Sequence, residues 1–259
     1  MATLILLYVV AAGLIFGSFF NVVIYRLPRG LNLSRPPSAC PGCGAHIKPY
    51  DNIPILSYLI LRGKCRKCGQ RISPIYPAVE ALTAVGFVLV YLNSGRVISL
   101  TFIAGCLFTS ALIILGVIDA QHQILPDAIT MPGLALALTY SFFRDDLNFR
   151  GALFGAVAGG GFLMLVYGAY RLIRKKEGLG MGDVTMMLMV GAYLGWQRTL
   201  LVLILASFTG ALFGLYLIAR KGKDAQFALP FGTFIAPAAF VAMLWGERIV
   251  RAYLSLYKR

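Results

Sequence analysis

Eight apolar runs separated by polar loops make up most of this chain of 259 residues. The first run, Leu4 to Ile24, has about 20 residues, which is enough to cross a hydrocarbon core of roughly 30 Å. The others cover residues 78–92, 98–118, 129–143, 152–170, 184–194, 200–219 and 229–244. This succession predicts an all-α polytopic membrane protein with about eight transmembrane helices.

The composition agrees with a lipid environment. Hydrophobic residues make up 59% of the chain and charged residues 13%, and the mean hydropathy is +0.78. Soluble domains average roughly 45–50% apolar and about 25% charged residues. The formal net charge of +14 comes from basic residues in the loops, which the positive-inside rule explains. We therefore expect the lipid bilayer as a partner and no nucleic acid.

The basic loops predict the orientation of the chain. The loop from Tyr25 to Pro74 has only one acid, Asp51, and nine basic residues: Arg26, Arg29, Arg35, Lys48, Arg62, Lys64, Arg66, Lys67 and Arg71. This excess places the loop in the cytoplasm and the N-terminus in the periplasm. The loops 119–128, 171–183 and 220–228 then also lie in the cytoplasm, the last two carrying Arg171, Arg174, Lys175, Lys176, Arg220, Lys221 and Lys223.

The cytoplasmic loop contains two CxxC motifs, which consist of Cys40, Cys43, Cys65 and Cys68. A spacing of this kind is typical of four-cysteine Zn²⁺ sites. Two disulfides or free thiols are the alternatives, but a reducing compartment disfavours disulfides. Four protein ligands leave no open position, so the sequence predicts a structural Zn²⁺ in two zinc knuckles. The apolar stretch from Tyr50 to Leu61, between the two knuckles, is too short to span, and we expect it to pack on the zinc-binding lobe or to lie against the membrane. We call the loop from Tyr25 to Pro74 the zinc loop.

Two aspartates lie where apolar runs meet polar loops, Asp119 and Asp183. Each could be a solvated helix cap, but carboxylates at a membrane edge are functional candidates. The predicted topology puts both on the cytoplasmic side, where a pair of close aspartates could share a proton and act as in aspartic proteases. Gly180 and Gly182 precede Asp183 and allow close backbone approach. Asp127 follows Pro126 and suits a capping or supporting position.

Other catalytic classes have few residues to use. His46 and His122 are the only histidines, and no HExxH helix or Walker A loop is present. Residues 159–161 are consecutive glycines, which favour close helix packing over nucleotide binding.

Several segments of the chain together resemble one known family, the type IV prepilin peptidases (leader peptidase/N-methyltransferases). The resemblance rests on five motifs in order: Gly17 to Pro28, the two CxxC knuckles, Tyr76 to Glu80, Asp119 to Asp127, and Gly180 to Asp183. It covers nearly the whole chain. One departure is Thr185, because the family usually has lysine two residues after the second aspartate.

The resemblance implies a GxGD-type aspartyl protease of the bacterial inner membrane, with Asp119 and Asp183 as its catalytic dyad. It implies cleavage of the leader from type IV prepilins and type II secretion pseudopilins, followed by N-methylation with S-adenosyl-L-methionine. Residues 1–77 would hold the first transmembrane helix and the methyltransferase-associated zinc loop, and residues 78–259 the helical peptidase domain. Asn21, Arg26 and Glu80 are candidates for the methyl-donor site or for helix packing, and the sequence does not locate that site.

Two rival functions remain open at this point. A membrane transporter or channel would use the intramembrane carboxylates to bind a cation, and ion flux in proteoliposomes without peptidase activity would identify it. A peptidase that does not methylate would leave a mature N-terminus without a methyl group. The sequence does not predict the oligomeric state.

Overall fold

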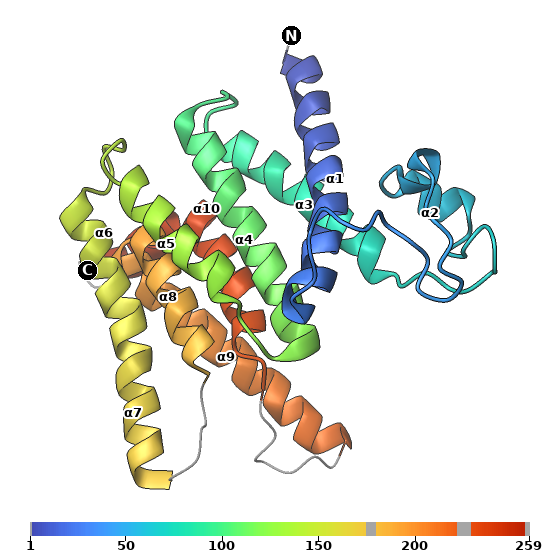
Figure 1. The fold of residues 1–259 in the computed structure, drawn as a ribbon. Helices are drawn as coiled ribbons and strands as arrows, with labels where there is room; N and C mark the ends of the chain where they lie inside the picture. The colour runs from blue at the N-terminus through green and yellow to red at the C-terminus, as the bar shows by residue number, and fades with distance from the viewer. Residues whose placement is uncertain (1, 175–179, 222–228, 257–259) are drawn as a thin grey trace. The chain divides into compact units, whose positions relative to one another are not determined.

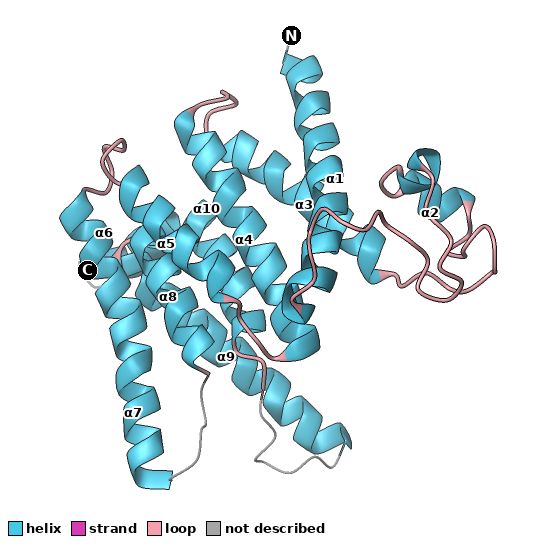
Figure 2. Ribbon diagram, in the orientation of Figure 1, coloured by secondary structure: helices cyan, strands magenta, loops and turns pink. Residues whose placement is uncertain are grey.

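The computed structural model describes residues 2–174, 180–221 and 229–256, and its regular elements in these residues are helices. Figure 2 shows helices joined by loops, and the only extended pairing in these residues is two isolated bridges in the zinc loop. The elements are α1 Ala2–Arg26, η1 Leu27–Arg29, η2 Pro49–Asn52, α2 Leu56–Ile60, α3 Ile75–Asn93, α4 Leu100–His122, α5 Asp127–Tyr140, α6 Phe149–Ala156, η3 Val157–Gly161, α7 Phe162–Arg174, α8 Met181–Leu194, α9 Trp196–Lys221 and α10 Gly232–Leu256 (Figure 1).

Six stretches of the described residues are long and apolar enough to cross a membrane: Thr3–Arg29, Ile75–Asn93, Leu100–His122, Phe149–Ile173, Trp196–Arg220 and Gly232–Leu256. Each corresponds to one of the eight predicted runs. The other two runs form α5 and α8, of 14 residues each. A helix of that length measures about 21 Å, which is less than the roughly 30 Å of a hydrocarbon core.

The chain forms two compact units, Met1–Ile114 and Leu115–Arg259. The first contains α1, the zinc loop, α3 and most of α4. Gly13 and Gly17, one turn apart on α1, let that helix approach α3 closely. A Cβ at Gly13 would lie 2.5 Å from the Cα of Ala84, and one at Gly17 would lie 2.7 Å from the Cα of Glu80. Small residues of this spacing are common at helix contacts in membranes.

The second unit is built around α8. Every residue of α8 from Asp183 to Leu194 is buried except Leu188, because α5, α6, η3, α9 and α10 surround the helix. In Figure 1, α8 is seen next to α5, α6 and α9. The helix begins at Met181, before Asp183, and is therefore longer than the predicted apolar run 184–194.

Glycines make this burial possible. A Cβ at Gly191 of α8 would lie 2.1 Å from the carbonyl oxygen of Gly155 on α6, so the two backbones are in direct contact. The glycine run 159–161 lies in a π-helical turn, η3, where Cβ atoms at Gly159 and Gly160 would collide with Met187 and Leu188. The prediction of close helix packing for this run is therefore confirmed.

Part of the predicted charge pattern lies outside the described residues. Lys175, Lys176 and Lys223 belong to the loops that were assigned to the cytoplasm, and the structure does not describe them.

Candidate active site and metal centre

Asp119 lies in the last turn of α4 and is only 4% exposed. Its Oδ2 accepts two hydrogen bonds from Thr233 at the start of α10, one from the backbone N–H at 2.7 Å and one from the hydroxyl at 3.1 Å. The N-terminus of a helix carries partial positive charge and unpaired N–H groups, so it favours a carboxylate. The beginning of α10 therefore holds the side chain of Asp119 in place.

Asp183 lies in the first turn of α8 and is 7% exposed. Its Oδ2 accepts a hydrogen bond from the backbone N–H of Gly180 at 3.2 Å. Its Oδ1 is buried and has no hydrogen-bond partner among the described residues. A buried polar atom without a partner is rare and is a place where a ligand or water would bind. This oxygen is thus available for chemistry.

The two predicted aspartates come together, as expected. Their carboxylates are close enough to interact electrostatically with each other, and the backbone N–H of Gly232 faces both. Asp183 is in the first turn of α8, and the side chain of Asp119 faces the first turn of α10. The second unit thus contains a buried pair of carboxylates held by backbone donors.

Leu125 packs against two glycines of this site. A Cβ at Gly182 would lie 2.7 Å from the Cβ of Leu125, and a Cβ at Gly232 would lie 2.9 Å from its Cδ1 and 3.0 Å from Asp119 Oδ2. A Cβ at Gly180 would meet only Asp183 Oδ2, at 3.3 Å, and a backbone nitrogen at 3.9 Å. Of the two glycines for which we predict a close backbone approach, Gly182 has the much closer neighbour.

Asp127 makes its hydrogen bonds with two threonines, apart from this pair of carboxylates. It is the first residue of α5, where Pro126 occupies the cap position without a side-chain cap bond. Its Oδ1 accepts hydrogen bonds from the hydroxyls of Thr130 at 3.3 Å and Thr185 at 3.2 Å. Thr185 therefore links α8 to α5 through its hydrogen bond to Asp127.

The four cysteines also come together, with their sulfur atoms all within 4.8 Å of one another. The Sγ atoms of Cys40 and Cys68 are 3.8 Å apart. A tetrahedral site with bonds of about 2.3 Å to sulfur requires sulfur separations of roughly 3.8 Å, so the arrangement fits one Zn²⁺.

The two knuckles have the same backbone geometry. Gly44 donates to the carbonyl of Cys40, and Gly69 donates to that of Cys65, each at 2.9 Å. Both glycines have positive φ, +67° and +70°, which a side chain would disfavour. Backbone N–H groups of Cys68 and Lys67 lower the pKa of Cys65 to about 6, which favours the thiolate at that residue. At Cys68 a backbone bond to Gln70 lowers the pKa, but burial and the neighbouring thiols raise it to about 11.

A pocket of about 580 Å³ adjoins these cysteines within the first unit. Its lining combines apolar side chains, among them Ile47 and Ile72, with the charged groups of Lys48, Asp51 and Arg71. This size and mixture are typical of sites for small molecules and cofactors.

Glu80 belongs to the first unit and is 8% exposed. Its Oε2 accepts a hydrogen bond from the backbone N–H of Ile55 at 2.7 Å, and its carboxylate interacts with the Ser18 side chain. The other two candidates for methyl transfer or packing also have structural partners. Asn21 donates to the carbonyl of Tyr76 at 3.0 Å, and Arg26 donates to carbonyls of the loop that follows α1.

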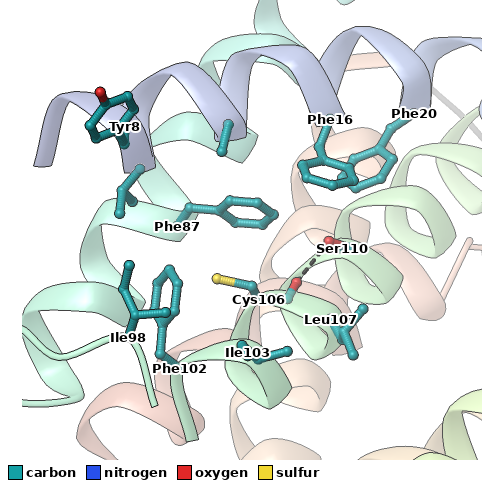
Figure 3. Close-up of a pocket in the computed structure, with 12 residues that line it drawn as sticks. Tyr8, Phe16, Phe20, Phe87, Ile98, Phe102, Ile103, Cys106, Leu107 and Ser110 are labelled. Carbon is teal, nitrogen blue, oxygen red and sulfur yellow. Dashed lines mark hydrogen bonds between the residues drawn. The ribbon is translucent and has the colours of Figure 1, made fainter. Parts of the chain in front are cut away.

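A second pocket, of about 410 Å³, lies between α1, α3 and α4 and is almost entirely apolar (Figure 3). Phe16, Phe87 and Phe102 line it, together with the free thiol of Cys106. The hydroxyl of Ser110 is already engaged with the carbonyl of Cys106 at 2.7 Å. This pocket has no charged group for peptide cleavage or methyl transfer.

Gly232 and Thr233 were missed by reasoning from the sequence. They are far from the aspartates in the chain, since Thr233 is 114 positions from Asp119. The available signal was the run Pro230-Phe231-Gly232-Thr233 before an apolar stretch, which is typical of a helix start.

Two segments of the chain match models of known protein families. Residues 11–94 match the "Bacterial Peptidase A24 N-terminal domain" and residues 106–215 match the "Type IV leader peptidase family". A prepilin leader peptidase/N-methyltransferase of Pseudomonas aeruginosa is 38% identical over 94% of this chain and 91% of its own length. One from Klebsiella pneumoniae is 44% identical over 76% of this chain and 88% of its own length, and one from Dichelobacter nodosus is 36% identical over 92% and 90%.

No solved structure matches the chain significantly. The family assignment therefore rests on similarity in sequence, which extends over nearly the whole chain and includes the segments that carry the two aspartates and the four cysteines. On these grounds the chain belongs to the type IV leader peptidase family.

Proposed function

We propose that this protein cleaves the basic leader from type IV prepilins and pseudopilins with Asp119 and Asp183, and then methylates the new N-terminus. The observation that carries the peptidase proposal is the buried pair of carboxylates, in which Asp183 Oδ1 has no described partner. The names of the relatives, prepilin leader peptidase/N-methyltransferase, support both activities. A cation transporter would not account for this family membership.

The chemistry of the pair follows from two close carboxylates. They cannot easily both ionise, so one holds a proton while the other is charged. The charged carboxylate takes a proton from water, which attacks the scissile carbonyl, and the protonated one donates a hydrogen bond to the carbonyl oxygen. The C–N bond then breaks, and the departing amine receives the proton that came from the water. Donors from Gly232 and Thr233 keep the two side chains in position.

Cleavage of a purified prepilin in detergent or nanodiscs tests this assignment. Asp119→Asn and Asp183→Asn should each lower the cleavage rate by about 10²–10⁴-fold, the usual range for loss of acid–base catalysis. Asp145→Asn, an exposed acid in the loop before α6, should cleave as the wild type does. Full leader removal by either dyad variant would refute the assignment.

We also propose that Cys40, Cys43, Cys65 and Cys68 bind a structural Zn²⁺, and that S-adenosyl-L-methionine is the methyl donor. The pocket beside the cysteines suits the donor in size, and the cations of Lys48 and Arg71 suit its carboxylate. The bound donor would supply an activated methyl group to the free amine. Equilibrium dialysis with labelled donor, comparing wild type with Arg71→Gln, tests the pocket without relying on turnover.

The remaining parts of the proposal concern topology and the division of labour. We place the protein in the bacterial inner membrane with its N-terminus in the periplasm and the zinc loop in the cytoplasm, on the basis of the basic loops. Residues 1–77 would serve methyl transfer and residues 78–259 cleavage. The short helices α5 and α8 would complete a set of eight membrane helices, with α8 shielded from lipid by its neighbours.

A further inference from the structure

The short helix α2 directs apolar side chains outward. Leu56, Leu59 and Ile60 have the i, i+3, i+4 spacing of one helical face, and they are 51%, 65% and 65% exposed. Ile53, just before the helix, is 45% exposed. We call these four residues the α2 face. Other residues of the stretch do pack on the loop, since Ser57 is buried and Leu61 lines the pocket beside the cysteines.

The position of α2 relative to the hydrocarbon core of the membrane follows from its contact with α3. The backbone N–H of Ile55 donates to Glu80, which is five residues after the first residue of α3, Ile75. Five residues correspond to about 7–8 Å along a helix axis. The 19 residues of α3 make a helix of about 28 Å, so nearly all of α3 is needed to cross a hydrocarbon core of roughly 30 Å.

Glu80 therefore lies within the hydrocarbon core, close to its edge. Helical side chains lean toward the N-terminus of their helix, which brings the carboxylate back toward the membrane surface. These relations place Ile55 and the start of α2 at the boundary between headgroups and acyl chains.

A hydrogen bond from Ile55 to Glu80 attaches the start of α2 to α3. Ile55 has φ of +59°, a conformation that is rare for a β-branched residue and costs of order 1–3 kcal/mol. The hydrogen bond to Glu80 satisfies the N–H of this residue, as irregular backbone near lipid requires. The neighbouring contacts of Glu80 with Ser18 and of Asn21 with Tyr76 join α1 and α3 at the same level. This network fixes which side of α2 points away from the protein unit.

The charges that follow α2 suit a membrane surface. Arg62 and Lys64 are exposed, and the whole loop from Tyr25 to Pro74 has a single acid. Basic residues beside an apolar face are attracted to anionic lipid headgroups.

We propose that the α2 face inserts into the bilayer interface, with Arg62 and Lys64 at the level of anionic headgroups, and so holds the zinc loop against the membrane. The occupant of this surface is lipid. Both ends of the loop are already attached to candidate membrane spans, α1 and α3, so the insertion requires no other partner.

Fluorescence quenching by lipid tests this inference. The chain has two tryptophans, and Trp196→Phe with Trp245→Phe gives a background free of them. Leu59→Trp and Ile60→Trp are placed singly in this background, with Lys67→Trp in the second zinc knuckle as the matched control. The variants are reconstituted in nanodiscs of phosphatidylcholine and phosphatidylglycerol, with either ordinary or brominated acyl chains.

We expect brominated chains to remove at least about half of the emission at positions 59 and 60, as for side chains buried some 5–10 Å into the interface, and to leave position 67 nearly unchanged. Equal quenching at all three positions would contradict the inference. Blue-shifted emission without quenching at 59 and 60 would show that protein covers the face, and would also overturn it. Two reporter positions keep the test decisive if one variant does not fold, and neither depends on catalysis.

Discussion

Thr233 binds the carboxylate of Asp119 with both its backbone N–H, at 2.7 Å, and its hydroxyl, at 3.1 Å. The hydroxyl also lies 3.3 Å from the carbonyl oxygen of Gly116, one turn earlier on α4. One residue at the start of α10 therefore sets the orientation of a proposed catalytic group that is at the end of α4.

Replacing Thr233 with valine should slow leader cleavage while leaving the fold intact. The backbone N–H remains, but the hydroxyl donor to Asp119 is lost. A hydrogen bond to a charged group contributes about 1.5–3 kcal/mol, so the expected loss in kcat is roughly 10–100-fold. Steady-state cleavage of a prepilin peptide measures it, and KM should change little.

Thr209→Val is the matched control for this substitution. Thr209 lies in α9 and is exposed, and its hydroxyl donates to the carbonyls of Leu205 and Ala206 in its own helix. The control should retain wild-type cleavage. An unchanged rate in Thr233→Val would show that the hydroxyl has no part in positioning Asp119.

The two glycines before Asp183 should differ in their tolerance of a side chain. Gly182→Ala would place a methyl group 2.7 Å from the Cβ of Leu125, which requires movement of backbone at the site. Gly180→Ala meets little beyond the carboxylate of Asp183 itself. We expect Gly182→Ala to lose at least about tenfold more activity than Gly180→Ala, in line with an overpacking cost of about 1–3 kcal/mol. Similar losses in the two variants would contradict the packing described.

Removal of one zinc-loop cysteine should release metal. Cys40→Ser leaves three thiolates, so metal analysis should give well below the one Zn²⁺ per chain expected of the wild type. Thermal unfolding of the loop should occur at lower temperature, because a structural metal contributes directly to folding. Cys106→Ser, which removes a thiol outside the cluster, should keep the wild-type zinc content. Equal zinc in both variants would refute the four-cysteine site.

The loop after α5 should show a small pH dependence of stability. Hydrogen bonds from the Arg144 guanidinium hold the pKa of Asp146 below its usual value, and Arg144 also donates to the carbonyl of Tyr193 on α8. Because the pKa is depressed in the folded state, this stabilisation is present above the unfolded pKa, near 4, and is lost as the pH falls through the folded value.

Asp146→Asn should therefore lower the free energy of unfolding at pH 7 and have no effect at a pH below both pKa values. The Asp146 side chain is 55% exposed, so screening should keep the difference under about 1 kcal/mol. Unfolding in detergent at neutral and acidic pH measures this. A difference between wild type and variant that does not shrink in acid would contradict the assignment.

Much of the fold could be predicted because its signals are local. Apolar runs identify membrane helices by length, and CxxC spacing identifies a four-cysteine cluster without knowledge of the rest of the fold. The pairing of Asp119 with Asp183 was also predicted, since loop charges put both residues on one side of the membrane.

The remaining features depend on contacts between distant segments. Nothing in the residues around Gly232 and Thr233 indicates that they lie beside Asp119, because that contact joins the start of α10 to the end of α4, 114 positions earlier in the chain. Likewise, the length of α8 is explained by burial among glycine-rich neighbours, which a hydropathy pattern does not reveal. The outward direction of the α2 face depends on one long-range hydrogen bond, from Ile55 to Glu80.

The most direct test of the proposed dyad is the cleavage rate of the double variant Asp119→Asn/Asp183→Asn beside the two single variants. Residues that act as one catalytic unit are strongly non-additive, so the double variant should be no more than about threefold slower than either single variant. All three rates should lie about 10²–10⁴-fold below wild type. A double variant slowed by the product of the two single effects, or a single variant that cleaves at nearly the wild-type rate, would contradict the account.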